Sequence, residues 1–223
     1  MLRLLAIVTA LVACGNPTDV PKDAPVDTAD DIDAAIDAPQ CTIGDLSMPI
    51  ELEFGYYNNQ TGALVPVGNM MPLPITQSEQ GGFTMRVGVR ARNVNCNVKT
   101  ATIAMFDTCP GDRLLKVESR SPISLTEGSD GWGTPINLAS YMQLHACPYT
   151  GLTRHMEDVP YRIQLALEDY DGRTAEGTLY VLPYCGDTDD ATRAICECQC
   201  NKDYVIGGAC PPTSSGPPAV CDP

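Results

Sequence analysis

The sequence predicts a mainly β fold, an antiparallel β-sandwich with a small disulfide-rich C-terminal tail. Three observations carry this expectation. Several segments between residues 41 and 184 alternate apolar and polar side chains with a period of two, turn signals separate them, and cysteines are dense after residue 184. A period of two is typical of strands with one buried face, and about 140 residues are enough to bury one such core.

The strand pattern is clearest in four segments, and the last of them is followed by a turn and a partner strand. The turn is Asp171-Gly172, because an Asp-Gly pair between two alternating runs is typical of a β-hairpin. Helical spacing is found at residues 135–144, where Thr134-Pro135 would begin a helix. The expected strands are 50–56, 83–92, 100–106, 161–169 and 178–182.

The stretch Tyr161-x-Ile-x-Leu-x-Leu-x-Asp169-x-x-Gly172 resembles the closing strands of immunoglobulin-like and polycystic-kidney-disease-like modules. The resemblance implies an immunoglobulin-like β-sandwich for residues 41–184. It implies nothing about an activity, because one fold supports many functions.

Residues 1–13 predict an export signal, in which Arg3 precedes an apolar run that is shorter than the roughly 20 residues needed to span a bilayer. The tetrapeptide Leu11-Val12-Ala13-Cys14 resembles the lipobox of bacterial lipoproteins. The resemblance implies that the signal is cut before Cys14 and that this cysteine is acylated. In that family Gly15, which is not an aspartate, implies the outer membrane or the cell surface. The alternative is an ordinary secretion signal with an incidental cysteine.

Residues 14–40 predict an acidic tether without a fold of its own. Gly15–Gln40 contains seven aspartates and four prolines and has no aromatic residue. Such a composition cannot bury enough apolar area to offset the entropy of ordering the chain. Calcium binding by these aspartates is the alternative, but the spaced Asp-x-Asp-x-Asp-Gly loop that favours it is absent.

The chain has eleven cysteines, and ten remain if Cys14 is acylated. Many cysteines in an exported chain are typical of a disulfide framework, and the sequence leaves their pairing open. A metal site at Cys196-Glu-Cys-Gln-Cys200 is the alternative, although zinc sites usually space their cysteines by two to four residues. The ten expected disulfide cysteines are Cys41, Cys96, Cys109, Cys147, Cys185, Cys196, Cys198, Cys200, Cys210 and Cys221.

Residues 185–223 form the expected cysteine-rich tail. The stretch Cys198-Gln-Cys200-Asn-Lys-Asp-Tyr204-Val-Ile-Gly207-Gly-Ala-Cys210 resembles the second half of an epidermal growth factor-like module. Asp203 stands where that family usually has glycine. The resemblance implies a bridge between Cys200 and Cys210, and any other small disulfide knot is the alternative.

The net charge of −14 narrows the choice of partners. An acidic chain is repelled by phosphate backbones, so nucleic acid is excluded as a partner. Anionic headgroups would repel it as well, so the acyl chains are the expected contact with the membrane.

Two features indicate a ligand-binding surface. Arg86, Arg90 and Arg92 share one face of the strand expected at 83–92, opposite its apolar residues. This stripe suits an anionic ligand or an acidic polysaccharide, and pairing with the chain's own acids is the alternative. Trp132 lies on a glycine-rich loop, where a tryptophan can stack on a sugar or fold back into the core.

Motifs for catalysis are missing from the sequence. It has neither a Gly-x-Ser-x-Gly elbow nor a His-Glu-x-x-His helix. His145 and His155 are expected to be surface or packed residues, and no catalytic residue, resident metal or cofactor is predicted. The acidic residues at the hairpin, Glu168, Asp169 and Asp171, are alternative calcium ligands, although the turn alone accounts for them.

The sequence therefore predicts a membrane-anchored envelope or cell-surface lipoprotein with a non-enzymatic binding or structural role. The expected partner is a polysaccharide or another surface protein. The alternatives are an assembly subunit of an envelope complex and, with the least support, a secreted hydrolase.

Overall fold

Strands dominate the computed structural model, which describes residues 41–109, 111–157 and 159–211. The chain divides into two units, Met1–Ala38 and Pro39–Pro223, and all described residues lie in the second. The prediction of a mainly β fold is confirmed. The described elements are β1 (Thr42–Ile43), β2 (Glu51–Tyr57), β3 (Leu64–Pro66), β4 (Met71–Gln77), β5 (Phe83–Arg92), β6 (Val94–Asn95), β7 (Asn97–Asp107), β8 (Arg113–Arg120), β9 (Ile123–Glu127), β10 (Gly133–Pro135), a 3₁₀ turn (Leu138–Ser140), β11 (Met142–Cys147), β12 (Tyr161–Asp169), β13 (Thr174–Cys185) and α1 (Asp190–Gln199).

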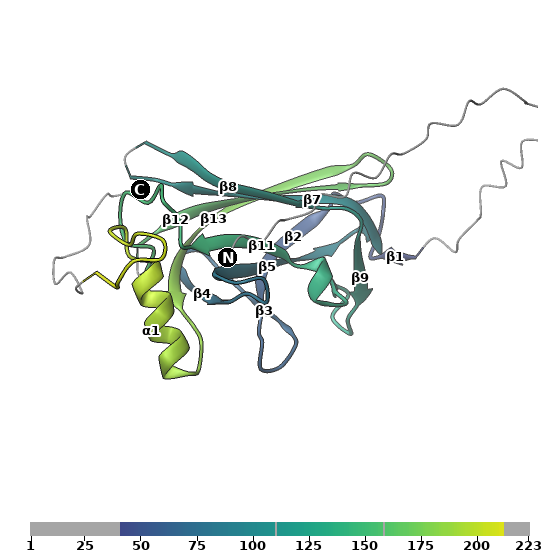
Figure 1. Ribbon diagram of the computed structural model, residues 1–223. Helices are drawn as coiled ribbons and strands as arrows, with labels where there is room; N and C mark the ends of the chain where they lie inside the picture. Colours follow the sequence, from purple (N-terminus) through teal and green to yellow (C-terminus); the bar gives the residue numbers. More distant parts are fainter. Residues whose placement is uncertain (1–40, 110, 158, 212–223) are drawn as a thin grey trace, which may run out of the picture. The chain divides into compact units, whose positions relative to one another are not determined.

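The strands form two layers that face each other across the core (Figure 1). One layer contains β8, β7, β12 and β13, and the other contains β4, β5, β2, β3 and β11. Two strands pass from one layer to the other: β4 pairs with both β13 and β5, and β9 pairs with both β7 and β10. Because β10 also pairs with β5, hydrogen-bonded neighbours can be followed from β5 through β4, β13, β12, β7, β9 and β10 back to β5.

One strand pair is parallel, which corrects the expectation of a wholly antiparallel arrangement. Residues Met71 to Ile75 of β4 run beside Val181 to Cys185 of β13 in the same direction. The sequence pattern did not indicate β4, because Pro72 and Pro74 interrupt it and proline is normally excluded from central strands.

The hairpin expected at Asp171-Gly172 is confirmed. In β12 every second residue is buried, from Tyr161 to Asp169, and the strand pairs in register with β13. Gly172 has a φ of +75°, a left-handed conformation that glycine adopts without a Cβ clash. The Asp169 carboxylate accepts hydrogen bonds from the Asp171 and Arg173 amides (3.0 and 2.9 Å), which fixes the turn.

The helix expected at residues 135–144 is wrong. This stretch ends β10, makes one 3₁₀ turn and begins β11. In β11, Met142 and Leu144 both enter the core while Gln143 between them does not, so the period of two prevails over the helical spacing. A helix forms instead at α1, whose first turn is capped by Asp189: its side chain accepts a hydrogen bond from the Thr192 amide (2.8 Å).

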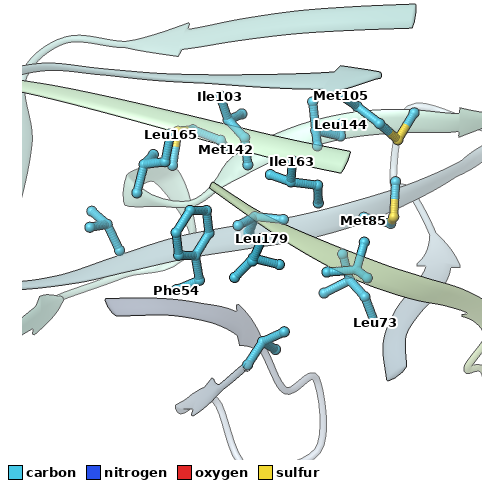
Figure 2. Packing of buried hydrophobic residues seen from close by; sticks show 14 of the residues in the cluster. Phe54, Leu73, Met85, Ile103, Met105, Met142, Leu144, Ile163, Leu165 and Leu179 are labelled. Atoms are coloured by element: carbon cyan, nitrogen blue, oxygen red, sulfur yellow. The ribbon is translucent and has the colours of Figure 1, made fainter. Parts of the chain in front are cut away.

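The core lies between the two layers and is built from alternating strand residues. Figure 2 shows how side chains of β7, β12 and β13 meet those of β2, β4, β5 and β11. The labelled residues are Phe54, Leu73, Met85, Ile103, Met105, Met142, Leu144, Ile163, Leu165 and Leu179.

All nine described cysteines are disulfide-bonded, as the sequence predicted, and Cys221 lies outside the described residues. Cys109 is among the bonded cysteines. The epidermal growth factor-like pairing of Cys200 with Cys210 is wrong. Helix α1 carries Cys196 and Cys198 and presents them to different partners. The described bridges are Cys41–Cys96, Cys147–Cys200, Cys185–Cys196 and Cys198–Cys210.

Candidate functional site

A pocket of about 210 Å³ opens where the β2–β3 turn faces the ends of β4 and β13. We call it the tyrosine pocket, because three tyrosines line it from strands that are distant in the sequence. Its walls are residues 56–60, Pro74, Thr76, Tyr184 and residues 186–188.

Hydrogen bonds donated by backbone amides hold two walls of the tyrosine pocket. The Gly186 amide donates to the Ile75 carbonyl (2.9 Å), and the Gln77 amide donates to Oδ2 of Asp187 (3.0 Å), so the segment after β13 is fastened along β4. On the opposite wall, Oδ1 of Asn58 accepts from the Gln60 amide (2.8 Å) and rigidifies the turn. The pocket is therefore preformed.

Two phenols of the pocket are partly removed from water. Burial raises the pKa of Tyr184, and the nearby phenol of Tyr56 raises it further. Neither hydroxyl makes a hydrogen bond to another described residue, so both are available to a molecule that occupies the pocket.

The predicted arginine stripe lies on the outer face of β5, and its three members have different surroundings. Arg90 pairs with Glu53 (2.8 Å) and with Asp130, and Arg92 pairs with Glu51 (2.6 Å). The charges of these two arginines are thus already balanced by acids of the same chain.

Arg86 differs from the other two arginines because it is buried and its partners are neutral. Its Nη1 donates to Oδ1 of Asn59 (2.6 Å), and its Nη2 lies 3.5 Å from the Gln77 carbonyl oxygen. Both partners adjoin the tyrosine pocket, because Asn59 lines it and the amide of Gln77 holds Asp187. Arg86 therefore supports the wall of the pocket from behind.

Trp132 does not enter the core. It is partly exposed and lies over the guanidinium groups of Arg90 and Arg92, 5.2 and 5.0 Å from the ring centroid. The structure thus brings Trp132 and two arginines of the stripe together, in cation–π contacts that hold the glycine-rich loop against β5. Ligand binding by Arg86, Arg90, Arg92 or Trp132 stays a prediction.

A second, wider groove of about 750 Å³ runs between β8 and β11. Glu118 lies in it beside Arg120, 2.7 Å away, and burial raises the pKa of Glu118. His145 lines the same groove, and one of its ring nitrogens lies 3.3 Å from the Pro148 carbonyl oxygen. Glu118 was not singled out from the sequence, because nothing distinguishes it there from the chain's other acids.

The acidic residues of the β12–β13 hairpin are each held by a separate protein group. Glu168 pairs with Lys99 (2.5 Å), the buried Asp169 pairs with Arg173 (2.6 Å), and Asp171 accepts a hydrogen bond from Asn95 (2.9 Å). The turn and these partners account for all three carboxylates, and calcium binding there has no geometric support.

The sulfur atoms of Cys185, Cys196 and Cys200 lie within 4.8 Å of one another and are buried. They belong to two neighbouring disulfides, Cys185–Cys196 and Cys147–Cys200. Metal ions bind thiolates, so the alternative metal site at Cys196 to Cys200 would require both bridges to be reduced first.

Beside the pocket, Tyr141 covers the outer face of β5. A Cβ on Gly88 would lie 2.6 Å from the Tyr141 ring, so glycine is needed for this close approach. The Tyr141 ring meets that of Tyr57 edge-on, with centroids 5.0 Å apart. Burial, with a smaller effect from Tyr57, raises the pKa of Tyr141 from 10.0 to about 12.

Tyr141 is therefore expected to make the protein sensitive to alkali. The neutral phenol stabilises the fold fully below pH 10, and this stabilisation is lost as the pH rises through about 12. At pH 11 the loss is about 1.4 kcal/mol. In urea unfolding, Tyr141→Phe should reduce the difference in stability between pH 7 and pH 11 by that amount. Tyr170→Phe, at an exposed turn, should leave it unchanged. Equal pH dependence of wild type and Tyr141→Phe would contradict this prediction.

Cys14 and the tether at residues 14–40 lie outside the described residues. Among those that are described, no helix is both long and apolar enough to cross a membrane. Comparison with family models, with curated proteins and with solved structures finds no match for the chain.

Proposed function

We propose that the chain is an exported lipoprotein of the bacterial outer membrane or cell surface, anchored through acyl chains on Cys14. In this proposal residues 1–13 are removed, residues 14–40 act as a tether, and the β fold binds an envelope component without catalysing a reaction. The lipobox resemblance at Leu11 to Cys14 supports the anchor.

The observation that carries the proposal is the state of the cysteines. All nine that the structure describes are disulfide-bonded, and structural disulfides persist in oxidising compartments outside the bacterial cytosol. Two of the four described bridges join segments far apart in the sequence, Cys41 with Cys96 and Cys147 with Cys200. These bridges strongly restrict the unfolded chain, as suits a small domain without cytosolic chaperones.

A role in binding is favoured by the tyrosine pocket. Its lining combines phenols, side-chain amides and one carboxylate, which are groups that orient a ligand through hydrogen bonds. We further propose that the two layers form an immunoglobulin-like sandwich. Their facing arrangement around one core supports this classification, and the parallel β4–β13 pair is a departure from a purely antiparallel sandwich.

Substitution of Cys14 tests the anchor directly. When the full-length chain is expressed in a bacterial host supplied with a labelled fatty acid, wild type should carry the label and sediment with membranes. Cys14→Ser should carry none, because the acylated atom is lost. Cys221→Ser, which removes a cysteine elsewhere in the chain, is the control and should keep the label. Equal labelling of wild type and Cys14→Ser would contradict the proposal.

A further inference from the structure

We propose that the tyrosine pocket binds a neutral hexopyranose unit of an envelope or cell-surface polysaccharide. This inference rests on the proposed function of an envelope binding protein and names its ligand class. It places the ligand in the tyrosine pocket and not on the arginine stripe.

The size of the pocket matches one ring. Its volume of about 210 Å³ lies below the roughly 300–1,000 Å³ of sites for drug-sized molecules, so one small ring fits and a longer chain would extend outward. The walls are already fastened by the hydrogen bonds from Gly186 to Ile75 and from Gln77 to Asp187. A preformed pocket limits the entropy lost when a weakly held sugar binds.

The polar groups of the pocket suit hydroxyl ligands. The hydroxyls of Tyr56, Tyr184 and Thr76 line the pocket and make no hydrogen bond to another described residue. A phenol can both donate and accept, as can each hydroxyl of a sugar. The three hydroxyls are not among the buried polar atoms that lack a partner, so they are open to the pocket and can bond to sugar hydroxyls directly.

The aromatic rings suit the apolar side of a sugar. Tyr56, Tyr57 and Tyr184 all line this one small pocket. The face of an aromatic ring carries negative partial charge and attracts weakly positive C–H groups. A pyranose presents both a C–H face and hydroxyl edges, so the rings and the polar groups of the pocket can be engaged at once.

Charge favours a neutral sugar over a uronic acid. Asp187 is the one charged residue among those that line the pocket in the described chain. Arg86 lies behind Asn59 and already donates to its amide oxygen (2.6 Å). An acidic sugar would meet the Asp187 carboxylate first, and the chain as a whole carries a net charge of −14.

The test is an amide-resolved NMR titration of the full chain carrying Cys14→Ser, which prevents acylation. The probes are the methyl glycosides of D-glucose, D-galactose and D-mannose, with D-glucuronate as the acidic comparison. At least one methyl glycoside should shift the amides of residues 58–60 and 186–188 saturably. The double variant Tyr56→Phe/Tyr184→Phe keeps both rings and should weaken that binding at least about tenfold.

Two control variants test whether the loss of sugar binding is specific to the tyrosine pocket. Tyr180→Phe removes a hydroxyl from the same strand as Tyr184 but outside the pocket, and it should change the affinity less than about twofold. Trp132→Ala disrupts the contact with Arg90 and Arg92 and should also leave the titration unchanged. Unchanged amide spectra of the double Phe variant away from the pocket would show that its fold is intact.

Three results would overturn the inference: no methyl glycoside shifts these amides, the double Phe variant binds as wild type does, or glucuronate binds more tightly than the neutral sugars. These results leave the proposed function intact if Cys14 is acylated, since only the ligand class is then wrong. Failure of acylation would overturn the proposed anchor whatever the titration shows.

Discussion

Replacement of Asp107 by alanine is expected to lower the free energy of unfolding by about 3–5 kcal/mol, because it leaves a buried arginine without its counter-ion. Asp107 is fully buried and lies 3.0 Å from Nε of Arg154, which is 3% exposed. Its carboxylate also accepts hydrogen bonds from the Cys109 amide (3.0 Å) and from the Thr153 hydroxyl (2.7 Å).

The surroundings of Arg154 explain why Asp107→Ala should lower the free energy of unfolding so much. Its Nη2 donates to the Pro160 carbonyl (2.5 Å), and its guanidinium lies 4.6 Å from the centroid of the Tyr161 ring. The side chain is therefore fixed in the interior and cannot turn to water when Asp107 is removed. The segment between β11 and β12 would have to rearrange to solvate it.

The chain offers a matched control for this prediction. Asp112 also pairs with an arginine, Arg162, in a two-pronged contact (2.9 and 2.6 Å), but it is exposed. Asp112→Asn, which removes the charge but tolerates the left-handed backbone at this position (φ +49°), should therefore cost no more than about 1 kcal/mol. Urea unfolding of the two variants at neutral pH measures the difference. A similar decrease in the free energy of unfolding for both variants would show that the buried Asp107–Arg154 pair stabilises the fold no more than the exposed pair does.

Removal of the Cys147–Cys200 bridge is expected to lower the stability of the fold about as much as Asp107→Ala does. The bridge joins the end of β11 to the end of α1 across 53 positions, and loop-closure entropy alone assigns it about 4 kcal/mol. Both cysteines are buried, with exposures of 0% and 1%, so a double alanine variant would also leave unfilled space in the core.

The Cys198–Cys210 bridge is the comparison. It spans 12 positions, Cys210 is exposed, and the same entropy argument assigns it about 3 kcal/mol at most. In thermal unfolding, Cys147→Ala/Cys200→Ala should therefore lower Tm more than Cys198→Ala/Cys210→Ala. The opposite order would mean that the tail folds independently of the β layers.

Much of the strand pattern could be predicted from the sequence, because a strand with one buried face alternates apolar and polar residues with a period of two. Residues 83–92 and 161–169 match β5 and β12 at both ends. The hairpin at Gly172 could also be predicted, because the preference of an Asp-Gly pair for a tight turn does not depend on tertiary contacts.

Other elements depend on contacts that the local sequence does not contain. Strand β4 carries two prolines and is held by its parallel neighbour β13. Helix α1 has one buried residue, Cys196, so its apolar periodicity was too weak to detect. At residues 135–144 the expected helix fails because Tyr141 must cover Gly88 while Met142 and Leu144 enter the core.

The candidate site could be predicted only in part from the sequence. The sequence placed Arg86, Arg90 and Arg92 on one face, and the structure adds that two of them are paired with acids and contact Trp132. The tyrosine pocket was missed, because Tyr56 and Tyr184 meet only after β2, β4 and β13 have assembled. Tyrosines flanked by amides after a strand were the available signal, and it is too common to be informative alone.

We propose an anchored protein of an oxidising compartment, and intact-mass analysis of its cysteines checks both the anchor and the compartment. The full-length chain, purified from the membranes of the fatty-acid-labelled bacterial host, is alkylated before and after reduction and weighed intact. We predict acyl mass on Cys14 and no alkylated cysteine until the protein is reduced. Free thiols at Cys196 and Cys200 in the untreated protein, without acyl mass, would contradict the claim and return those residues to consideration as metal ligands.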